Sequence, residues 1–315
     1  MKYTGIDIGG TKCAVITGDE NGITDKIKFG TTTVNETLEN IINAVEKLGV
    51  NDAIGISCGG PLDSKRGVIM SPPNLPGWDN IEIIKMLESK FGVPAGIQND
   101  ANACALAEWK YGAGRGAENM IFLTFGTGMG AGLILNGRLY AGTNDMAGEV
   151  GHIRMAEYGP VGYGKAGSFE GFCSGGGIAE TGKMIARERL QCGGKTAFCE
   201  SYAELDNITA KKIAECAKSG DKDSITVYDI CAEKLGRGLS ILIDILNPEK
   251  IVIGSVFERS GELLRKKMQE VIEREALFYA RNVCEIVPAA LGDEIGDRAA
   301  IAVAEDTLKR GKRDA

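Results

Sequence analysis

The chain has 315 residues, of which 43% are hydrophobic and 25% charged, and 36 Lys and Arg against 43 Asp and Glu give a formal net charge of −7. This length corresponds to about two domains, and the composition excludes disorder for most of the chain. The acidic balance is evidence against nucleic-acid binding, and no apolar run approaches the roughly 20 residues of a membrane span. The first expected strand follows Met1 without a basic and apolar leader, so we expect a cytoplasmic protein.

Cysteine and glycine usage are both informative. Nine cysteines without a Cys-x-x-Cys pair lie mostly in apolar patterns, which favours reduced thiols that act as small core residues. The 44 glycines are about twice the average share. Their clustering predicts several places where the backbone turns sharply or approaches another group closely.

The first half begins with three strands and then alternates helices with strands. Apolar runs bounded by turn residues predict the strands, and apolar residues at helical spacing predict the helices. The expected elements are strands over 3–8, 13–17, 23–29, 53–58 and 94–98, and helices over 38–48, up to Phe91 and over 101–111. Asn35 is the expected cap of the first helix, and this order predicts a mixed sheet covered by helices.

The opening pattern recurs after the glycine-rich segment 112–116, which is the expected hinge. Residues 3–29 and 120–141 share the plan strand, glycine loop, strand, tight turn, strand, and Asn136-Gly137 is a strong hairpin signal. The repeat indicates a duplicated domain half. The remaining expected elements are helices over 178–190, 209–218, 224–246, 261–277 and 298–308 and strands over 250–253 and 283–287.

The two glycine turns lie at matching positions of the two halves. Exposed N–H groups of such a turn can bind phosphate, and Thr11 and Lys12 add a hydroxyl and an ammonium group to the first turn. The order Thr-Lys departs from the P-loop pattern, and the hairpin after the second turn excludes the dinucleotide fingerprint. Each turn alone is typical of a plain hairpin, whereas the matching pair favours binding of adjacent phosphates of one nucleotide between the halves.

Asp100 and His152 each allow two interpretations. Asp100 could cap the helix over 101–111, or it could accept the proton of an attacking hydroxyl as a general base. His152 is the only histidine, and a lone histidine is commonly structural. Its neighbours Glu149 and Glu170 favour the other interpretation, because loop carboxylates and a histidine can bind the hydroxyls of a polyol.

Together these residues resemble the ROK family (repressors, open reading frames and kinases), and especially its sugar kinases of the bacterial glucokinase type. Each motif is weak alone, but the set is specific and spans nearly the whole chain. The motifs are Asp7-x-Gly9-Gly10-Thr11-Lys12, Ser71-Pro-x-Asn74-Leu-Pro-Gly77-Trp78, Asn99-Asp100-Ala-Asn102, Gly126-Thr127-Gly128-x-Gly130-x-Gly132, Gly148-Glu149-x-Gly151-His152, Ile251-Val-Ile-Gly254 and Leu291-Gly292-Asp293-x-x-Gly296.

The resemblance implies the α/β, two-lobed actin/hexokinase-like (ribonuclease H-like) ATPase fold with a duplicated core. Residues 1–112 would form the small lobe, joined by the C-terminal helix over 292–315, and residues 113–291 would form the large lobe. The implied activity is transfer of the γ-phosphoryl group of ATP, with Mg²⁺, to a hexose, normally at the 6-hydroxyl. A homodimer is also implied, while the acidic balance and the lack of a long apolar run predict no nucleic-acid or membrane partner.

The resemblance also implies a role for each motif residue. Asp100 would be the general base, and Asp7 would lie near the Mg²⁺ through water. The residues implied to bind the sugar are Gly60, Asn99, Asp100, Glu149, His152 and Glu170. The residues implied to bind the nucleotide are Gly9, Gly10, Thr11, Lys12, Thr127, Gly128 and Gly254.

Two segments depart from the family pattern. The family usually carries CxCGxxGCxE, whose three cysteines bind zinc together with the signature histidine. Here Val161, Tyr163 and Ser168 occupy the cysteine positions while the glycines and the glutamate keep their register, so we expect no structural zinc. Ser255 follows Gly254 where a further glycine is common, which leaves the nucleotide preference open.

Two alternatives to a hexokinase-type enzyme stay open. One is a sugar-responsive regulator, although family repressors carry an N-terminal helix-turn-helix and only six residues precede Asp7 here. The other is a kinase homologue that binds sugar without turnover; Asp100, Lys12 and both glycine turns are evidence against it. The sequence leaves the hexose open, with glucose as the default.

Overall fold

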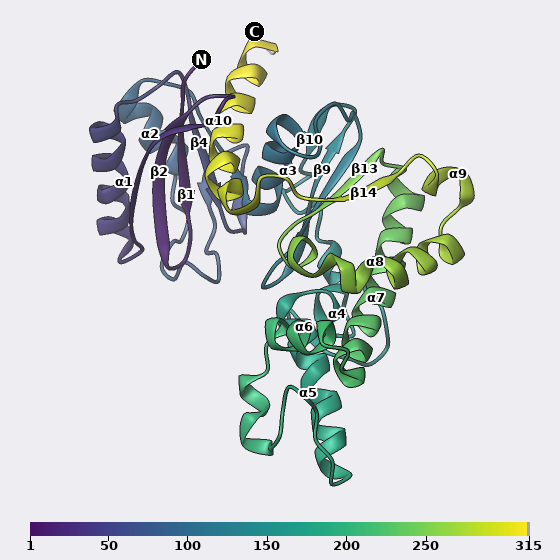
Figure 1. Cartoon of the computed structure of the whole chain (residues 1–315). Helices are drawn as coiled ribbons and strands as arrows, with labels where there is room; N and C mark the ends of the chain where they lie inside the picture. Colours follow the sequence, from purple (N-terminus) through teal and green to yellow (C-terminus); the bar gives the residue numbers. More distant parts are fainter. Residues whose placement is uncertain (314–315) are drawn as a thin grey trace. The chain divides into compact units, whose positions relative to one another are not determined.

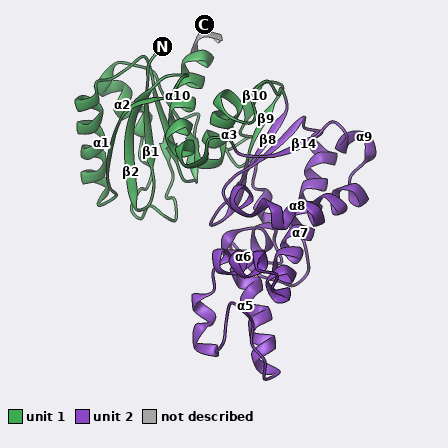
Figure 2. Ribbon diagram, viewed as in Figure 1, with its two compact units in different colours: residues 1–118, 132–147, 290–315 green, residues 119–131, 148–289 purple. Residues whose placement is uncertain are grey.

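The structure, a computed structural model, describes residues 1–313 and consists of two compact units (Figures 1 and 2). Unit 1 contains Met1–Glu118, Gly132–Ala147 and the described residues from Ala290 onward. Unit 2 contains Asn119–Ala131 and Gly148–Ala289. No helix among residues 1–313 combines the length and the apolar character needed to cross a membrane.

The sheet of unit 1 is mixed, as the sequence predicted. Its strands are β1 (Tyr3–Ile8), β2 (Lys12–Gly18), β3 (Ile23–Gly30), β4 (Ile54–Cys58) and β7 (Ala95–Asn99). Their order in the sheet is β3-β2-β1-β4-β7. Strand β2 pairs antiparallel with both β1 and β3, whereas β4 pairs parallel with both β1 and β7. The carboxyl ends of three neighbouring strands therefore lie at one edge. A small hairpin, β5 (Leu62–Asp63) and β6 (Val68–Ile69), follows β4.

Helices cover both faces of this sheet. They are α1 (Val34–Leu48), α2 (Ile83–Phe91), α3 (Asp100–Tyr111) and α10 (Ile295–Arg313). Ile41 of α1 and Leu87 of α2 belong to the core on one face, and α10 contacts β1 and β4 on the other. The predicted cap Asn35 is wrong, because the helix begins earlier and the Thr33 hydroxyl accepts the hydrogen bond from the N–H of Glu36.

Three glycines in register allow α10 to lie directly on the sheet (Figure 1). Gly5 on β1 pairs with Gly55 on β4, which pairs with Gly96 on β7. A Cβ atom at Gly55 would lie 2.2 Å from the carbonyl oxygen of Ala300 and from the backbone nitrogen of Ala304. Glycine is needed here because the helix backbone occupies the space of a side chain.

The second sheet repeats the order of the first. Its strands are β8 (Met120–Phe125), β9 (Met129–Leu135), β10 (Arg138–Tyr140), β13 (Lys250–Ile253) and β14 (Glu285–Pro288). The order β10-β9-β8-β13-β14 again reads third, second, first, fourth and fifth strand, so the predicted duplicated core is confirmed. The division into units passes through β9 after Ala131, whereas the sequence assigned all of 113–291 to one lobe. The reason lies at Gly132, where a Cβ would be 2.4 Å from the carbonyl oxygen of Ala101 on α3.

Unit 2 is mostly helical outside its strands. Its helices are α4 (Phe169–Phe172), α5 (Gly175–Gln191), α6 (Ala210–Lys218), α7 (Lys222–Leu246), α8 (Val256–Glu275) and α9 (Phe278–Arg281), with a hairpin of β11 (Val161–Gly162) and β12 (Lys165–Ala166). The sequence placed the start of α8 at Gly261. The helix begins earlier, and Ser260, with φ −140°, forms a kink that interrupts the helical period.

Gly55→Ala is expected to lower the free energy of unfolding by about 1–3 kcal/mol, because the added methyl group overlaps backbone atoms of α10 that cannot rotate away. Gly30→Ala is the control, since a Cβ there meets nothing within 4 Å. It should change stability by less than about 0.5 kcal/mol. Urea unfolding followed by circular dichroism measures both, and equal midpoints would contradict the close approach of α10.

Candidate active site

Polar residues gather at the carboxyl ends of the parallel strands of unit 1. Asp7 lies near the end of β1, Gly60 follows β4, and Asn99 and Asp100 stand where β7 passes into α3. The last residues of the three strands are paired in register, so these positions share one edge of the sheet. Ligands of α/β sheets commonly bind at this edge.

Asn99 and not Asp100 caps α3. The side-chain oxygen of Asn99 accepts a hydrogen bond of 2.8 Å from the N–H of Asn102, and Asp100 is the first residue of the helix. The interpretation of Asp100 as the cap is therefore wrong. Its carboxylate accepts a hydrogen bond of 2.9 Å from the N–H of Ala101, but burial raises its pKa. The residue is nevertheless exposed at the surface, and an accessible carboxyl with a raised pKa is suited to accept a proton.

Asp7 is a half-buried carboxyl in unit 1. Burial, followed by the charge of Asp297, raises its pKa from 3.8 to about 6, while Lys26 opposes the shift and Asp100 adds to it. Lys26 forms an ion pair with Asp297. A Cβ at Gly296, in the first turn of α10, would lie 3.6 Å from Oδ2 of Asp7. Asp7 thus faces the start of α10 in an electronegative environment.

The first glycine turn contacts the segment over 71–78. The N–H of Gly9 donates to the carbonyl oxygen of Lys12 at 3.1 Å. A Cβ at Gly10 would lie 2.3 Å from the carbonyl oxygen of Asn74, and neither Gly9 nor Gly10 has a positive φ. The glycine at position 10 therefore serves contact with the 71–78 segment, and Thr11 and Lys12 are exposed beside it.

The second glycine turn contacts Glu170. The N–H of Gly126 donates to the carbonyl oxygen of Gly128 at 3.1 Å, and the N–H of Met129 donates to Oε2 of Glu170 at 2.9 Å. A Cβ at Gly128 would lie 2.7 Å from the same carboxylate oxygen. The structure therefore brings together Glu170 and the predicted phosphate-binding turn in unit 2.

Glu149 and His152 lie on a 3₁₀ turn beside this pair. The N–H of His152 donates to the carbonyl oxygen of Glu149 at 3.1 Å. A Cβ at Gly151 would lie 2.1 Å from the carbonyl oxygen of Met129 and 3.2 Å from Cβ of Glu170. Glu149, His152 and Glu170 thus form one group within unit 2, and the His152 side chain is exposed.

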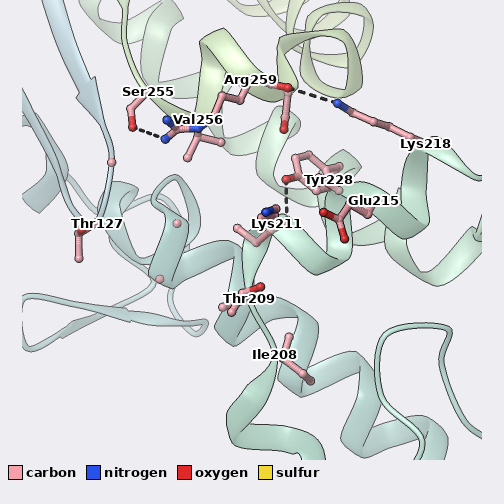
Figure 3. Close-up of a pocket in the computed structure, with 17 residues that line it drawn as sticks. Thr127, Ile208, Thr209, Lys211, Glu215, Lys218, Tyr228, Ser255, Val256 and Arg259 are labelled. Atoms are coloured by element: carbon pink, nitrogen blue, oxygen red, sulfur yellow. Dashed lines mark hydrogen bonds between the residues drawn. The ribbon is translucent and has the colours of Figure 1, made fainter. Parts of the chain in front are cut away.

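A cavity of about 690 Å³ opens in unit 2 next to the second glycine turn (Figure 3). Gly126 and Thr127 form one end, and the start of α5, helix α6, Tyr228 of α7 and the start of α8 form the rest. Lys211 and Lys218 of α6 line it, and sequence reasoning missed both. The helical spacing of apolar residues in α6 predicts that both lysines lie on its polar face, but it does not predict that this face borders a cavity.

Ser255 lies on the wall of this cavity, whereas the predicted contact Gly254 does not line it. Ser255 has φ +57°, a conformation that favours glycine and strains other residues. Its N–H donates to Oε1 of Glu258 at 2.7 Å, and its hydroxyl accepts a hydrogen bond of 2.7 Å from Arg259. These bonds hold the serine in the conformation that a family glycine would adopt freely.

The duplicated sheets and the glycine turns define an α/β protein of the actin/hexokinase-like fold. Comparison with known proteins agrees: the ROK family model matches residues 3–307. A glucokinase of Halalkalibacterium halodurans is 35% identical over 93% of this chain and 92% of that protein. A ROK family glucokinase from Streptomyces griseus, solved with glucose and AMPPNP, is 29% identical with a TM-score of 0.74, over 97% of this chain and 99% of that one. The ROK hexokinase of Thermus thermophilus is 28% identical with a TM-score of 0.78, over 99% and 100%. The chain belongs to the ROK family.

Asp7→Asn is expected to stabilise the ligand-free protein at neutral pH. With a pKa raised from 3.8 to about 6, Asp7 keeps a proton in the folded chain over a pH range in which the unfolded chain has lost it. Stability from this group is therefore present below pH 3.8 and lost as the pH rises through 6. The neutral amide avoids that loss, so we expect a gain of about 1–3 kcal/mol above pH 7 that disappears near pH 4. Equilibrium unfolding of both proteins at several pH values, with a chelator present, measures the difference in the free energy of unfolding. A difference that does not vary with pH would contradict a raised pKa of Asp7.

Proposed function

We propose that this protein transfers the γ-phosphoryl group of ATP to the 6-hydroxyl of a hexose, with Asp100 as the general base. The protein is a sugar kinase of the ROK family, and its relatives of similar length include glucokinases. The observation that carries the proposal is the Asp100 carboxyl, which is accessible at the end of β7, has a pKa raised by desolvation and is released from the capping role by Asn99.

The hexose is bound by side chains that suit hydroxyl groups. In unit 1 these are Asn99 and Asp100, with the backbone at Gly60; in unit 2 they are Glu149, His152 and Glu170. Carboxylates accept hydrogen bonds from sugar hydroxyls, and an amide or imidazole can donate or accept. The contacts within each unit support the assignment, because Asn99 is fixed by its cap bond and Glu170 by its bond from Met129.

The nucleotide is bound by the two glycine turns and by the cavity of unit 2. A cavity of about 690 Å³ has the size of a nucleotide site, and Thr127 and Ser255 lie on its wall. Lys211, Lys218 and Arg259 outnumber Glu215, the one carboxylate among the described lining residues, so the lining has a net positive charge that suits a phosphorylated ligand. Gly9, Gly10, Thr11, Lys12, Gly128 and Gly254 complete the proposed nucleotide contacts.

Asp7 fits a role beside Mg²⁺. A hard oxygen ligand in an electronegative environment suits this cation, which commonly binds through one or two carboxylates, water and substrate phosphates. No group of three or more His, Cys, Asp or Glu side chains within residues 1–313 is arranged to hold a metal by itself. We therefore assign Asp7 a contact through water, and the bound cation would neutralise phosphate charge.

The chemistry requires mainly positioning and one proton transfer. Asp100 accepts the proton of the sugar hydroxyl as that oxygen attacks the γ-phosphorus, and Lys12 places positive charge beside the phosphates. The protein is further proposed to be a homodimer without structural zinc. A coupled assay of ADP release over a panel of hexoses tests the activity; sugar binding without turnover would favour a regulator or an inactive homologue instead.

Asp100→Asn is expected to lower kcat by about 10²–10⁴-fold, because an amide cannot accept the proton. Since Asn99 provides the cap, melting temperature should stay unchanged or rise slightly, and sugar affinity should change little. Asp223→Asn is the matched control, because Asp223 is also an aspartate in the first turn of a helix, α7. Steady-state kinetics and calorimetric sugar binding are measured for both variants. A wild-type kcat in Asp100→Asn would show that Asp100 is not the general base.

Ala210→Phe tests the nucleotide cavity, which Ala210 lines at the start of α6. The larger ring is expected to fill part of the cavity and to raise the KM for ATP by at least about tenfold, with sugar binding in the absence of nucleotide unchanged. Ala210→Ser keeps the cavity open and serves as the control. An unchanged KM for ATP in the folded Phe variant would place the nucleotide elsewhere.

A further inference from the structure

The segment from His152 to Glu170 is closed by hydrogen bonds that the sequence did not reveal. The N–H of Phe169 donates to the carbonyl oxygen of Ile153 at 2.8 Å, and the N–H of Gly167 donates to that of Pro160 at 2.9 Å. Both ends of the segment therefore lie side by side in unit 2. It carries two proposed sugar ligands, one at each end.

Ser168 joins the hairpin to helix α4. Its side chain is buried, and its hydroxyl accepts a hydrogen bond of 3.0 Å from the N–H of Gly171 and donates one of 3.4 Å to the carbonyl oxygen of Gly162. The first bond caps α4, and Glu170 lies in the first turn of that helix. The cap therefore fixes the backbone that carries Glu170, and the N–H of Met129 fixes its carboxylate.

Lysine and arginine side chains tie the hairpin to the His152 turn. The ammonium of Lys165 donates to the carbonyl oxygen of His152 at 2.6 Å. The guanidinium of Arg154 donates to the carbonyl oxygen of Ala166 at 2.9 Å. Tyr163 and Gly164 make the turn with φ of +44° and +74°, the signature of a tight two-residue hairpin.

The residues present do not fit the zinc that the family pattern implies. Val161 and Tyr163 are 61% and 79% exposed, and a valine has no ligand atom. The Ser168 hydroxyl is engaged in its two hydrogen bonds. Cys173, the nearest cysteine along the chain, is buried, and its thiol donates to the carbonyl oxygen of Cys231 at 3.4 Å. A tetrahedral site needs four nitrogen, sulfur or carboxylate ligands, and these positions supply His152 alone.

We propose that Ser168 and Lys165 are positioning residues that hold the two sugar-binding ends of this segment in place without a metal. Ser168 fixes Glu170 through the cap of α4, and Lys165 fixes the backbone of His152. The inference rests on the proposed function for its effect on the sugar. It concerns the fold of the segment independently of any activity.

Three variants test the proposal. Ser168→Ala is expected to raise the KM for the phosphorylated hexose by about five- to tenfold, the effect of losing one cap bond at a ligand-bearing turn. Ser168→Thr keeps the hydroxyl and should restore most of the affinity. Asp221→Ala removes the cap of α7, where Asp221 accepts from the N–H of Ser224 at 2.8 Å, and should lower the melting temperature to a similar extent with an unchanged hexose KM.

Hydrogen exchange and metal analysis separate this proposal from the proposed function. Ser168→Ala should speed amide exchange over residues 160–172 whether or not the chain phosphorylates a hexose, and purified wild-type protein should contain no stoichiometric zinc. Unchanged exchange and hexose KM in Ser168→Ala, or one zinc per chain whose removal speeds the same exchange, would overturn it. If Ser168→Ala shows the expected faster exchange but the wild-type protein has no kinase activity, the proposed function is contradicted and the positioning role of Ser168 is not.

Discussion

The buried carboxylate of Glu108 joins two segments of unit 1 that are far apart in the sequence, the turn after α3 and the segment that precedes α10. It accepts hydrogen bonds from the N–H of Ala113 at 2.7 Å, of Ala290 at 3.0 Å and of Leu291 at 2.9 Å. A buried charge without such partners would be strongly destabilising, so these bonds are obligatory once Glu108 is inside. Because Leu291 leads directly into α10, the same carboxylate fixes where the helix that covers the sheet of unit 1 begins.

Glycines show best how far the sequence could predict the structure. Their clusters correctly indicated close backbone approach, but they did not reveal the partner. Gly112, expected as a hinge, must lack a side chain because a Cβ would lie 2.1 Å from Oε2 of Glu108. Gly10 and Gly128, expected to admit phosphate, stand against Asn74 and Glu170. At these positions the glycine indicates that other atoms occupy the space of a side chain, and only the folded structure shows which atoms they are.

The sequence could propose site residues because its motif positions coincide with strand ends and loops, which local patterns identify. The repeat predicted a duplicated core, but the strand order of the two sheets came from the structure. What the local patterns missed joins distant residues through helix faces: the α6 wall of the cavity with Lys211, and the bonds from Glu108 to Ala290. The possible cap named from the sequence, Asp100, lies one residue after the actual cap, Asn99. Asn and Asp cap helices equally well, so only the backbone conformation decides between two such neighbours.

The carboxyls of unit 1 are tolerated because α10 is anchored independently of them. The pKa values of Asp7 and Asp100 are raised because the surrounding protein desolvates both carboxyls, which destabilises the ligand-free fold at neutral pH. Arg298 offsets this at the start of α10, where its guanidinium lies 4.0 Å from the Tyr111 ring and donates to the carbonyl oxygen of Glu20 at 2.9 Å. Together with the glycine row under α10, this contact keeps the helix in place while its first turn faces Asp7. Stability is thus supplied along the length of α10, from Arg298 in its first turn to the residues that lie on the glycine row, while Asp297 in the same turn raises the pKa of Asp7.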